Sequence, residues 1–423
     1  MGKVRRRRTK YNKRNMNNNR HIPSGYKPSP LGIIPEDWEV KRIGDFGKVI
    51  TGNTPPTEDT DNYGNAYKFV SPADISDSKY IEATEKHLSE KGFSISRQMP
   101  IGTVLFTCIG STIGKCAIAN ETLTSNQQIN AIICDTKHSG EYLYYELSHR
   151  SNKIKQIAGE QAVPIINKST FENYKVLCPP FEEQKGIAKI LSLWDTAIAK
   201  QTALIEQLTL RKRGLMQQLL TGKKRLKGFG GEWEKIKFKE IFQRKTQIVN
   251  DSSNVQVLSV TKEGIVSQKE YFNKEVASDD TSKYLLVEKG DLAMSGLNFW
   301  MGSCHILTQY EKGIISPAYK VFSIRDGFSI EYIVNFVQSY NFKSSLLGSS
   351  VIGASIVRRN LDLEMLEEWT YLLPSLPEQK AISDILTYAD KEIETQKQKL
   401  AAMQTQKKGL MQVLLTGKRR INK

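Results

Sequence analysis

The feature that most constrains this chain is a long helical pattern that occurs twice. Residues 183–225 read EQKGIAKILSLWDTAIAKQTALIEQLTLRKRGLMQQLLTGKKR, and residues 378–420 read EQKAISDILTYADKEIETQKQKLAAMQTQKKGLMQVLLTGKRR. The second copy follows the first at a constant offset of 195 residues, without a gap. A repeat of this length decides the architecture before any short motif does, so the chain consists of two related halves.

Each copy has the pattern of one long helix. Apolar residues recur every seven positions, which is typical of the a and d seam of a coiled coil. Prolines at 179, 180 and 377 favour helix starts, and Gly222 and Gly417 favour helix ends. The seam residues are Leu191, Trp194, Ile198, Ile205, Leu208, Leu215 and Leu219 in the first copy, and Leu386, Ala389, Ile393, Leu400, Met403, Leu410 and Leu414 in the second.

Polar residues interrupt the two seams at matched places. Gln201 matches Gln396, and Lys212 matches Lys407. We interpret them as residues that set the register of one antiparallel coiled coil formed by the two copies; the alternative is a pair of ordinary bundle helices with a few polar positions. Basic residues cluster at both helix ends, where we expect contacts with phosphates or helix dipoles; they are Lys223, Lys224, Arg225, Lys227, Lys418, Arg419 and Arg420.

The repeat extends beyond the helices. Trp38 and Trp233 have the same offset, and each lies 145 residues before the Glu that opens its helix. Each half is therefore one globular body followed by one helix. The predicted divisions are a basic tail (1–26), a first body (27–180), a central helix (181–225), a second body (226–376) and a C-terminal helix (377–423).

The two bodies keep one order of elements although few of their residues agree. Each has a glycine-led apolar strand (103–107 or 291–295), a glycine-containing turn, two further apolar runs and one amphipathic helix. The predicted fold class is α+β, with two α/β bodies alternating with the paired helices in a pseudo-twofold repeat. Constant helices and divergent bodies indicate a protein that reads two different things at a fixed separation; neutral drift after duplication is the alternative.

The charge of the chain is concentrated at its start. The formal net charge is +16, and residues 1–20 hold nine basic residues and no acidic one, which leaves +7 for the rest. A basic chain points first to nucleic acid as a partner. The composition of the tail predicts disorder. The tail is either a nonspecific phosphate-binding arm or a consequence of start-codon choice, because Met16 opens a more usual leader.

Other compositional features exclude several classes of protein. The five cysteines form no C-x-x-C pair, so we expect reduced thiols and neither disulfides nor a zinc site. No apolar run is long enough to cross a membrane, and no hydrophobic signal sequence is visible. We therefore expect a cytoplasmic protein that binds no metal.

Four segments resemble catalytic motifs, and each fails on its residues. GSTIGKC (110–116) has one residue too few for a phosphate-binding loop and lacks the Ser or Thr that holds magnesium. CPPF (178–181) has Cys in place of the Asn or Asp of amino-methyltransferases. GFGG (228–231) follows no strand, and the acids of PEDWEVK (35–41) are too crowded for a nuclease. We predict no catalytic centre.

The remaining polar loop residues suit DNA reading. Arg and Lys contact phosphates or guanine, and Asn and Gln form hydrogen bonds with adenine in the major groove. For any single residue the alternative is an ordinary solvated surface position. The candidates are Ser111, Thr112, Lys115, Asn126, Gln127, Gln161, Asn167 and Lys168 in the first body, and Asn298, Trp300, Lys320, Arg358, Arg359 and Asn360 in the second.

The alternation of bodies and helices, the EQK openings and the GLMQ and LLTGK endings resemble the specificity subunit of type I restriction–modification enzymes. The resemblance covers about residues 30–420 and leaves the basic tail unexplained. It implies a non-catalytic subunit whose bodies each read one half of a split, asymmetric site in double-stranded DNA. It also implies that the helices set the gap and dock two modification subunits, which bind S-adenosylmethionine and methylate adenine.

The resemblance assigns all cofactors to partners: S-adenosylmethionine to the modification subunits, and ATP and Mg²⁺ to restriction subunits where those are present. Two other functions stay open at this point. One is a stand-alone DNA methyltransferase with unrecognised motifs, which cofactor binding by the isolated chain would reveal. The other is a coiled-coil assembly protein, which sequence-specific DNA protection would exclude.

Overall fold

The computed structural model divides the chain into two compact units. The first comprises residues 1–200 and 401–423, and the second comprises residues 201–400. The structure describes residues 22–159, 163–249, 255–272, 281–296, 299–355 and 358–421. Most of the predicted basic tail lies outside these residues. Its last residue, Tyr26, already belongs to strand β1 (Tyr26–Ser29) and donates a hydrogen bond to the carbonyl oxygen of Gly417 (2.9 Å).

The two predicted long helices are confirmed. Helix α4 spans Phe181–Leu219 and helix α10 spans Leu376–Leu414. Both end in the same way, because Gly222 and Gly417 have positive φ angles of 70° and 69°. This left-handed conformation turns the chain so that backbone N–H groups return to the last helical carbonyls. No helix in the described part of the chain is both long and apolar enough to cross a membrane.

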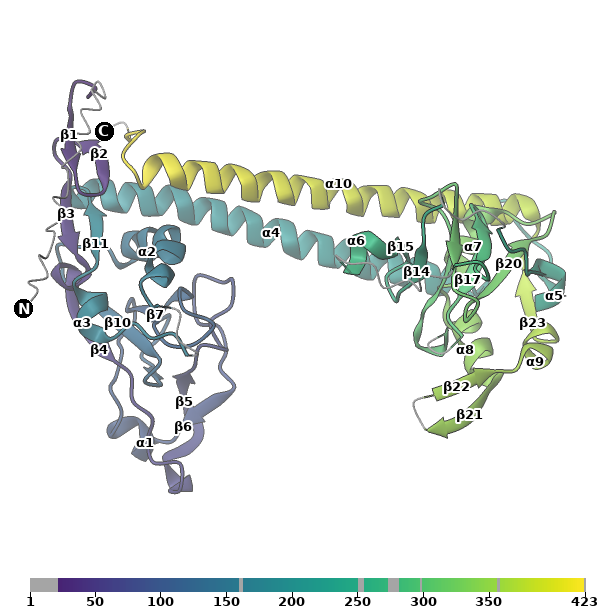
Figure 1. Cartoon of the computed structure of the whole chain (residues 1–423), viewed down its shortest axis with the longest axis horizontal. Helices are drawn as coiled ribbons and strands as arrows, with labels where there is room; N and C mark the ends of the chain where they lie inside the picture. Colours follow the sequence, from purple (N-terminus) through teal and green to yellow (C-terminus); the bar gives the residue numbers. More distant parts are fainter. Residues whose placement is uncertain are drawn as a thin grey trace, which may run out of the picture. The chain divides into compact units, whose positions relative to one another are not determined.

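A four-stranded antiparallel sheet forms the centre of the first body (Figure 1). Its strand order is β4-β10-β7-β8, with β4 at Gly47–Thr51, β10 at Ile129–Cys134, β7 at Val104–Thr107 and β8 at Cys116–Ile118. Helix α2 (Gly140–Gln156) packs on one face. Side chains alternate between the two faces of a strand. Phe106 therefore joins the core shared with α2 and α4, and Leu105 joins a second core on the opposite face.

The second body repeats this sheet despite its different sequence. The order is β13-β20-β17-β18, with β13 at Phe242–Lys245, β20 at Lys320–Ile324, β17 at Leu292–Met294 and β18 at Cys304–Ile306. Leu292 and Met294 face the core that contains α10 residues, whereas Ala293 faces the other core. The predicted mixture of helices and strands is thus present in both units.

Further paired strands attach each body to its helix. Strand β3 (Glu39–Arg42) pairs with β11 (Lys175–Cys178), and β12 (Glu234–Lys237) pairs with β23 (Thr370–Leu373). Other elements of the first unit are β2 (Gly32–Pro35), η1 (Ile43–Phe46), η2 (Thr60–Asn62), β5 (Tyr63–Val70), β6 (Lys86–Leu88), α1 (Glu90–Ser94), β9 (Thr124–Ser125) and α3 (Lys168–Glu172). Those of the second are α5 (Phe238–Ile241), β14 (Leu258–Val260), β15 (Ile265–Ser267), α6 (Gln268–Phe272), β16 (Leu285–Glu288), η3 (Phe299–Met301), β19 (Lys312–Ile315), β21 (Ser350–Ser355), β22 (Arg358–Leu361) and α9 (Leu363–Glu367).

The prediction of a single amphipathic helix in the second body is wrong. The segment forms two helices, α7 (Ile330–Phe336) and α8 (Tyr340–Gly348). Ser339 causes the break, because its hydroxyl accepts a hydrogen bond from the backbone N–H of Phe342 and thereby caps a new helix. Apolar spacing alone does not show such a cap inside a periodic segment.

A clasp of three residues joins body and helices in the first unit. We use this name for Trp38, Glu183 and Arg420. The Glu183 carboxylate accepts hydrogen bonds from the Trp38 indole N–H (2.9 Å) and from the Arg420 guanidinium (2.7 Å to each oxygen). Arg420 also donates to Asp37. Since Trp38 is fully buried, its polar N–H needs this acceptor.

The second unit contains the same clasp with the same donor and acceptor atoms. Glu378 accepts from the indole N–H of Trp233 (3.3 Å) and from Nε and Nη2 of Arg225 (2.7 and 2.8 Å). Arg225 and Arg420 thus have partners within the protein, and the expectation that they contact phosphates or helix dipoles stays a prediction. Charge alone did not show that each guanidinium binds the carboxylate that opens a helix, Glu183 or Glu378.

The two long helices contact each other in opposite directions within each unit. In the first, Lys407 forms an ion pair with Asp195, which also accepts from the hydroxyl of Tyr145. In the second, Lys212 forms an ion pair with Asp390 (2.6 Å). Also in the second unit, the side-chain amide of Gln201 donates to the side-chain oxygen of Gln396 (2.8 Å). The polar seam residues thus have partners on the opposite helix.

We predict that Glu183→Ala lowers the free energy of unfolding by about 2 kcal/mol, because it leaves the buried Trp38 N–H without an acceptor. Urea unfolding followed by tryptophan fluorescence measures the change. Glu182→Ala is the matched control, since the Glu182 side chain is 82% exposed and pairs only with Lys185 on its own helix within the described residues. Equal shifts of the two urea midpoints would contradict the role of the clasp.

Candidate nucleic-acid interface

Backbone hydrogen bonds bring three predicted segments of the first body together. The N–H of Cys108 donates to the carbonyl of Gln128, and the N–H of Ile166 donates to the carbonyl of Cys108 (both 2.8 Å). Ile109 and Ile165 form a bridge between the same segments. The turn after β7, the segment before β10 and the segment before α3 are therefore neighbours, although they lie far apart in the sequence.

The predicted residues on these segments differ in exposure. Ser111 and Gln127 are exposed, and Thr112 and Asn126 are half-buried. Gln127 accepts a hydrogen bond from the Thr54 hydroxyl (2.7 Å), while the Asn126 amide donates to the side chain of Gln128 (2.9 Å). The exposed side chains offer hydrogen-bond donors and acceptors to a ligand. The side chains of Asn126 and Gln128 already use part of their hydrogen-bonding capacity on each other.

Asn167 and Lys168 lie at the start of α3, and both are exposed. Asn167 caps the helix, because its side-chain oxygen accepts from the N–H of Thr170 (2.8 Å). Lys168 pairs with Glu172 one turn later (3.3 Å). The cap leaves the amide NH₂ of Asn167 as a donor at the surface.

Lys115 has contacts within its own body. Its ammonium group donates to the carbonyl oxygens of Ile75 (2.6 Å) and Pro72 (3.3 Å). In this structure its charge stabilises the loop before β6. Lys115 stays a predicted DNA contact, but these bonds give it a structural role.

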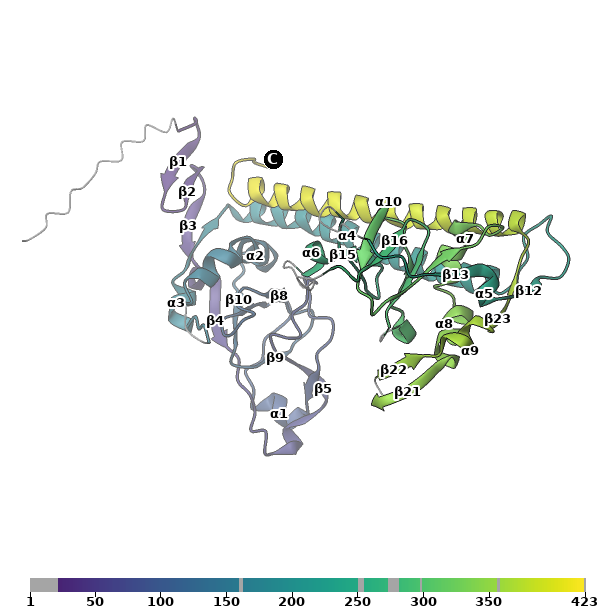
Figure 2. The same cartoon turned by 45° about the vertical axis from the view of Figure 1, so that its right-hand side comes forward.

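In the second body, two predicted residues meet. The guanidinium carbon of Arg359 lies 5.3 Å from the centre of the Trp300 ring. Lys320 opens β20 opposite Met294 and is half-buried, whereas Asn360 is exposed on β22. Strands β21 and β22 form a hairpin that lies beyond α8, on the side of the body away from α10 (Figures 1 and 2).

Three predicted positions are not fully described. Gln161 and Asn298 lie outside the described residues, and Arg358 belongs to β22 without a description of its side chain. The predictions for these three residues therefore stay predictions.

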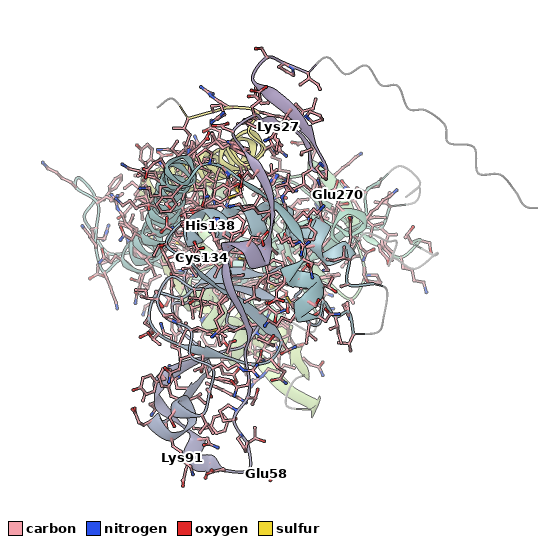
Figure 3. The ribbon with its side chains drawn as sticks, turned by 90° about the vertical axis from the view of Figure 1, so that its left-hand side faces the viewer. Lys27, Glu58, Lys91, Cys134, His138 and Glu270 are labelled. Atoms are coloured by element: carbon pink, nitrogen blue, oxygen red, sulfur yellow. The ribbon has the colours of Figure 1, made fainter. Side chains whose placement is uncertain are left out.

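The structure adds a lobe to the first body that the sequence did not indicate. Phe69, Leu88 and Phe93 form its small core, and Tyr67 stacks on Phe93 with ring centres 3.8 Å apart. A hollow of about 250 Å³ next to Asn126 is lined by Thr54 and Lys86 as well. Figure 3 places Lys91 and Glu58 in this lobe, at the end of the body away from the helices. The Lys86 and Thr54 side chains join the candidate surface, and no spacing pattern had indicated them.

The catalytic look-alikes have structural roles. Gln184 donates to the carbonyl of Pro179 (2.9 Å), which fixes the CPPF segment as the start of α4. Burial raises the pKa of the Cys178 thiol to about 11, so the thiolate is scarce at neutral pH. Cys116 of the GSTIGKC segment is a buried residue of β8, and Asp37 of PEDWEVK binds Arg420.

The comparisons with known proteins point to one family. Residues 35–210 match the model of a family described as "Type I restriction modification DNA specificity domain". The MjaVIII specificity subunit of Methanocaldococcus jannaschii is 29% identical over 423 residues, covering 92% of this chain and 94% of that protein. The MjaIX specificity subunit of the same organism is 34% identical over 194 residues, covering 44% of this chain and 45% of that protein.

Solved structures share the fold. A chain from a study of complex assembly and conformational transition of the type I R-M system has a TM-score of 0.58 at 14% identity, covering 91% of this chain and 99% of that chain. The S subunit from M. genitalium has a TM-score of 0.50 at 15% identity, covering 89% and 96%. Residues 35–210 thus match a type I DNA specificity domain, and the chain over most of its length is similar to type I restriction–modification specificity subunits. The DNA-recognition role that the sequence indicated is the role of this family.

We predict that Asn167→Asp weakens DNA recognition and leaves stability unchanged. Asp keeps the helix cap of α3, but its negative charge repels DNA phosphates. DNA binding by the complex, measured by fluorescence anisotropy at several salt concentrations, is expected to fall about tenfold. Asn173→Asp is the control, because Asn173 is the C-terminal cap residue of the same helix. Equal losses of binding for both variants would argue against a direct role of Asn167.

Proposed function

We propose that each body of this specificity subunit reads one half of a split, asymmetric DNA site. The observation that carries the proposal is the contrast between the two bodies: the central sheets have one strand order, and the loops around them differ. Next to the second sheet lies the hairpin β21–β22, whereas the first body has α3 and the Phe93 lobe. A common scaffold with different loops suits the reading of two different sequences.

We further propose that α4 and α10 pair along their lengths as an antiparallel coiled coil with pseudo-twofold symmetry. The ion pair between Asp195 and Lys407 and that between Lys212 and Asp390 join equivalent positions of the two copies, which supports this arrangement. The helices then set the number of base pairs between the half-sites. A span of 39 residues corresponds to about 58 Å of helix.

Two modification subunits are the partners that we propose for the helices. Each helix exposes a large apolar residue at the same place in the repeat: Leu193 is 62% exposed and Tyr388 is 72% exposed. Exposed apolar residues that recur with the repeat suit two copies of one partner. In this proposal the chain itself is not catalytic. S-adenosylmethionine binds to the modification subunits, and ATP and Mg²⁺ bind to restriction subunits where those are present.

The alternatives explain fewer features. A stand-alone methyltransferase requires a cofactor site. Three of the segments that resemble catalytic motifs instead start α4, form a turn and strand, or supply Trp38 and Asp37, and the carbonyls of the fourth, GFGG, accept hydrogen bonds from Arg225. A pure assembly protein gives no reason for two bodies with one sheet and different loops. The free cysteines and the DNA substrate suit the cytoplasm.

An exchange of bodies tests the proposed function. We expect replacement of residues 27–178 by the equivalent body of a relative to change one half-site and to preserve the other half-site and the gap. Methylome sequencing of cells that contain the modification subunit reads all three features. The chain without its modification subunit is expected to methylate nothing. A change in both half-sites would show that the bodies do not read independently.

Insertions in the helices test their role in spacing. One heptad inserted between Ala203 and Leu204, combined with one after Gln396 in α10, keeps the seam in phase and lengthens the pair by about 10 Å. We expect the gap to grow by about three base pairs and the half-sites to stay the same. A two-residue insertion at the same places rotates the seam by about 200° and is expected to abolish methylation. An active heptad variant with the original gap would refute the spacing role.

A further inference from the structure

Two other segments of the second body contact the Arg359 guanidinium. Its guanidinium lies over the indole of Trp300, which belongs to the turn between β17 and β18. Its Nη1 donates to the hydroxyl of Ser350 (3.1 Å), the first residue of β21. A flat cation stacked on an aromatic face has less rotational freedom than a solvated arginine.

The held guanidinium still has donors available. Arginine carries five N–H donors in a planar fork, and the bond to Ser350 uses one of them. Within the described part of the chain, the buried Nε of Arg359 and the buried Nε1 of Trp300 have no hydrogen-bond partner. An unpaired buried donor costs free energy, which the contact with Trp300 and the bond to Ser350 must offset, while the remaining Nη donors of the fork are the ones a ligand can use.

The pair is specific to the second body. The corresponding turn of the first body reads GSTIG and contains no aromatic residue. Arg359 lies on β22 of the hairpin, on the side of its body away from α10 (Figures 1 and 2). A planar guanidinium fork fits a phosphate as well as a guanine edge. Phosphate contacts carry no sequence information and would serve both bodies alike, whereas the corresponding turn of the first body has no aromatic residue to hold an arginine. The stacked, hydroxyl-bonded geometry instead suits the recognition of a flat acceptor pair.

We propose that Arg359 reads a guanine in the half-site of the second body and that Trp300 is its positioning residue. The O6 and N7 atoms of guanine form such a pair of acceptors in the major groove, and a bidentate arginine recognises them together. Trp300 and Ser350 fix the guanidinium plane before DNA arrives. This inference rests on the proposed function and adds the base that is read, the residue that reads it and the residue that orients it.

Base preference measured on the complex with its modification subunits tests the inference. In Arg359→Lys, we expect one position of the second half-site to lose its preference for guanine by about tenfold to a hundredfold. Trp300→Ala should relax the same position, and Trp300→Phe should restore the preference, because Phe keeps a stacking face. Arg244→Lys is the control, since Arg244 is an exposed arginine on β13 of the same body. The first half-site should not change in any variant.

Three outcomes would overturn the inference. An unchanged second half-site in Arg359→Lys would show that Arg359 reads no base. A uniform loss of binding to all sequences, with a smaller salt dependence, would identify a phosphate contact. Relaxation in Arg359→Lys but full preference in Trp300→Ala would remove the positioning role. These results leave the body exchange intact; failure of that exchange, or a wild-type complex without bipartite methylation, would overturn the proposed function and this inference with it.

Discussion

The carboxylate that opens each long helix is the group on which each unit depends. Glu183 and Glu378 each bind a tryptophan from the body that precedes the helix and an arginine from the end of the other helix. One side chain thus joins segments that are far apart in the sequence. The arginine donates through Nε and Nη2 to both carboxylate oxygens, a geometry that lysine cannot reproduce. The EQK opening and the arginine after LTGK are therefore two parts of one contact.

The sheet of each body separates two hydrophobic cores. One core packs against the long helices, and the other is closed by loops of the same body. Phe106 and Ile132 face the core shared with α2 and the long helices, whereas Leu105 and Ala131 face a core closed by the body's own loops. Residues on the helix side must fit elements that both halves keep. Core residues on the other face of the sheet need only fit the loops of the same body, whose sequence can change together with theirs. Such joint changes are tolerated because a core mainly requires apolar side chains of the right total volume. Sequence changes in these loops therefore leave the helix contacts intact.

The sequence predicted the elements that a period or a repeat specifies. The heptads, the prolines near the helix starts and the glycines after the helices predicted α4 and α10, whereas the bounds of the bodies stay predictions. Strand order was not predictable, because pairing joins segments such as β4 and β10 that no local pattern connects. The break between α7 and α8 was missed because it depends on one serine cap.

The sequence allowed us to predict which residues belong to the candidate surface, but not which contacts hold their side chains in place. Turn position and polarity suggested Asn167 and Arg359, but the cap at α3 and the stack on Trp300 depend on tertiary contacts. Lys115 shows the opposite case. Its sequence position resembled that of an exposed turn cation, while the carbonyls of Pro72 and Ile75 bind its ammonium group.

Duplication imposes a chemical rule on the helix contacts. Where a position meets its own copy and the same polar residue type faces itself, the side chain must both donate and accept a hydrogen bond. Glutamine satisfies this rule, because its amide has both a donor and an acceptor, and the Gln201 amide donates to Gln396. Two lysines or two glutamates at this position would instead place like charges next to each other. Positions that meet a different position can instead be charged, and there the copies have Asp195 with Lys407 and Lys212 with Asp390. In these three contacts the choice between an amide pair and an ion pair thus follows from whether a position meets its own copy.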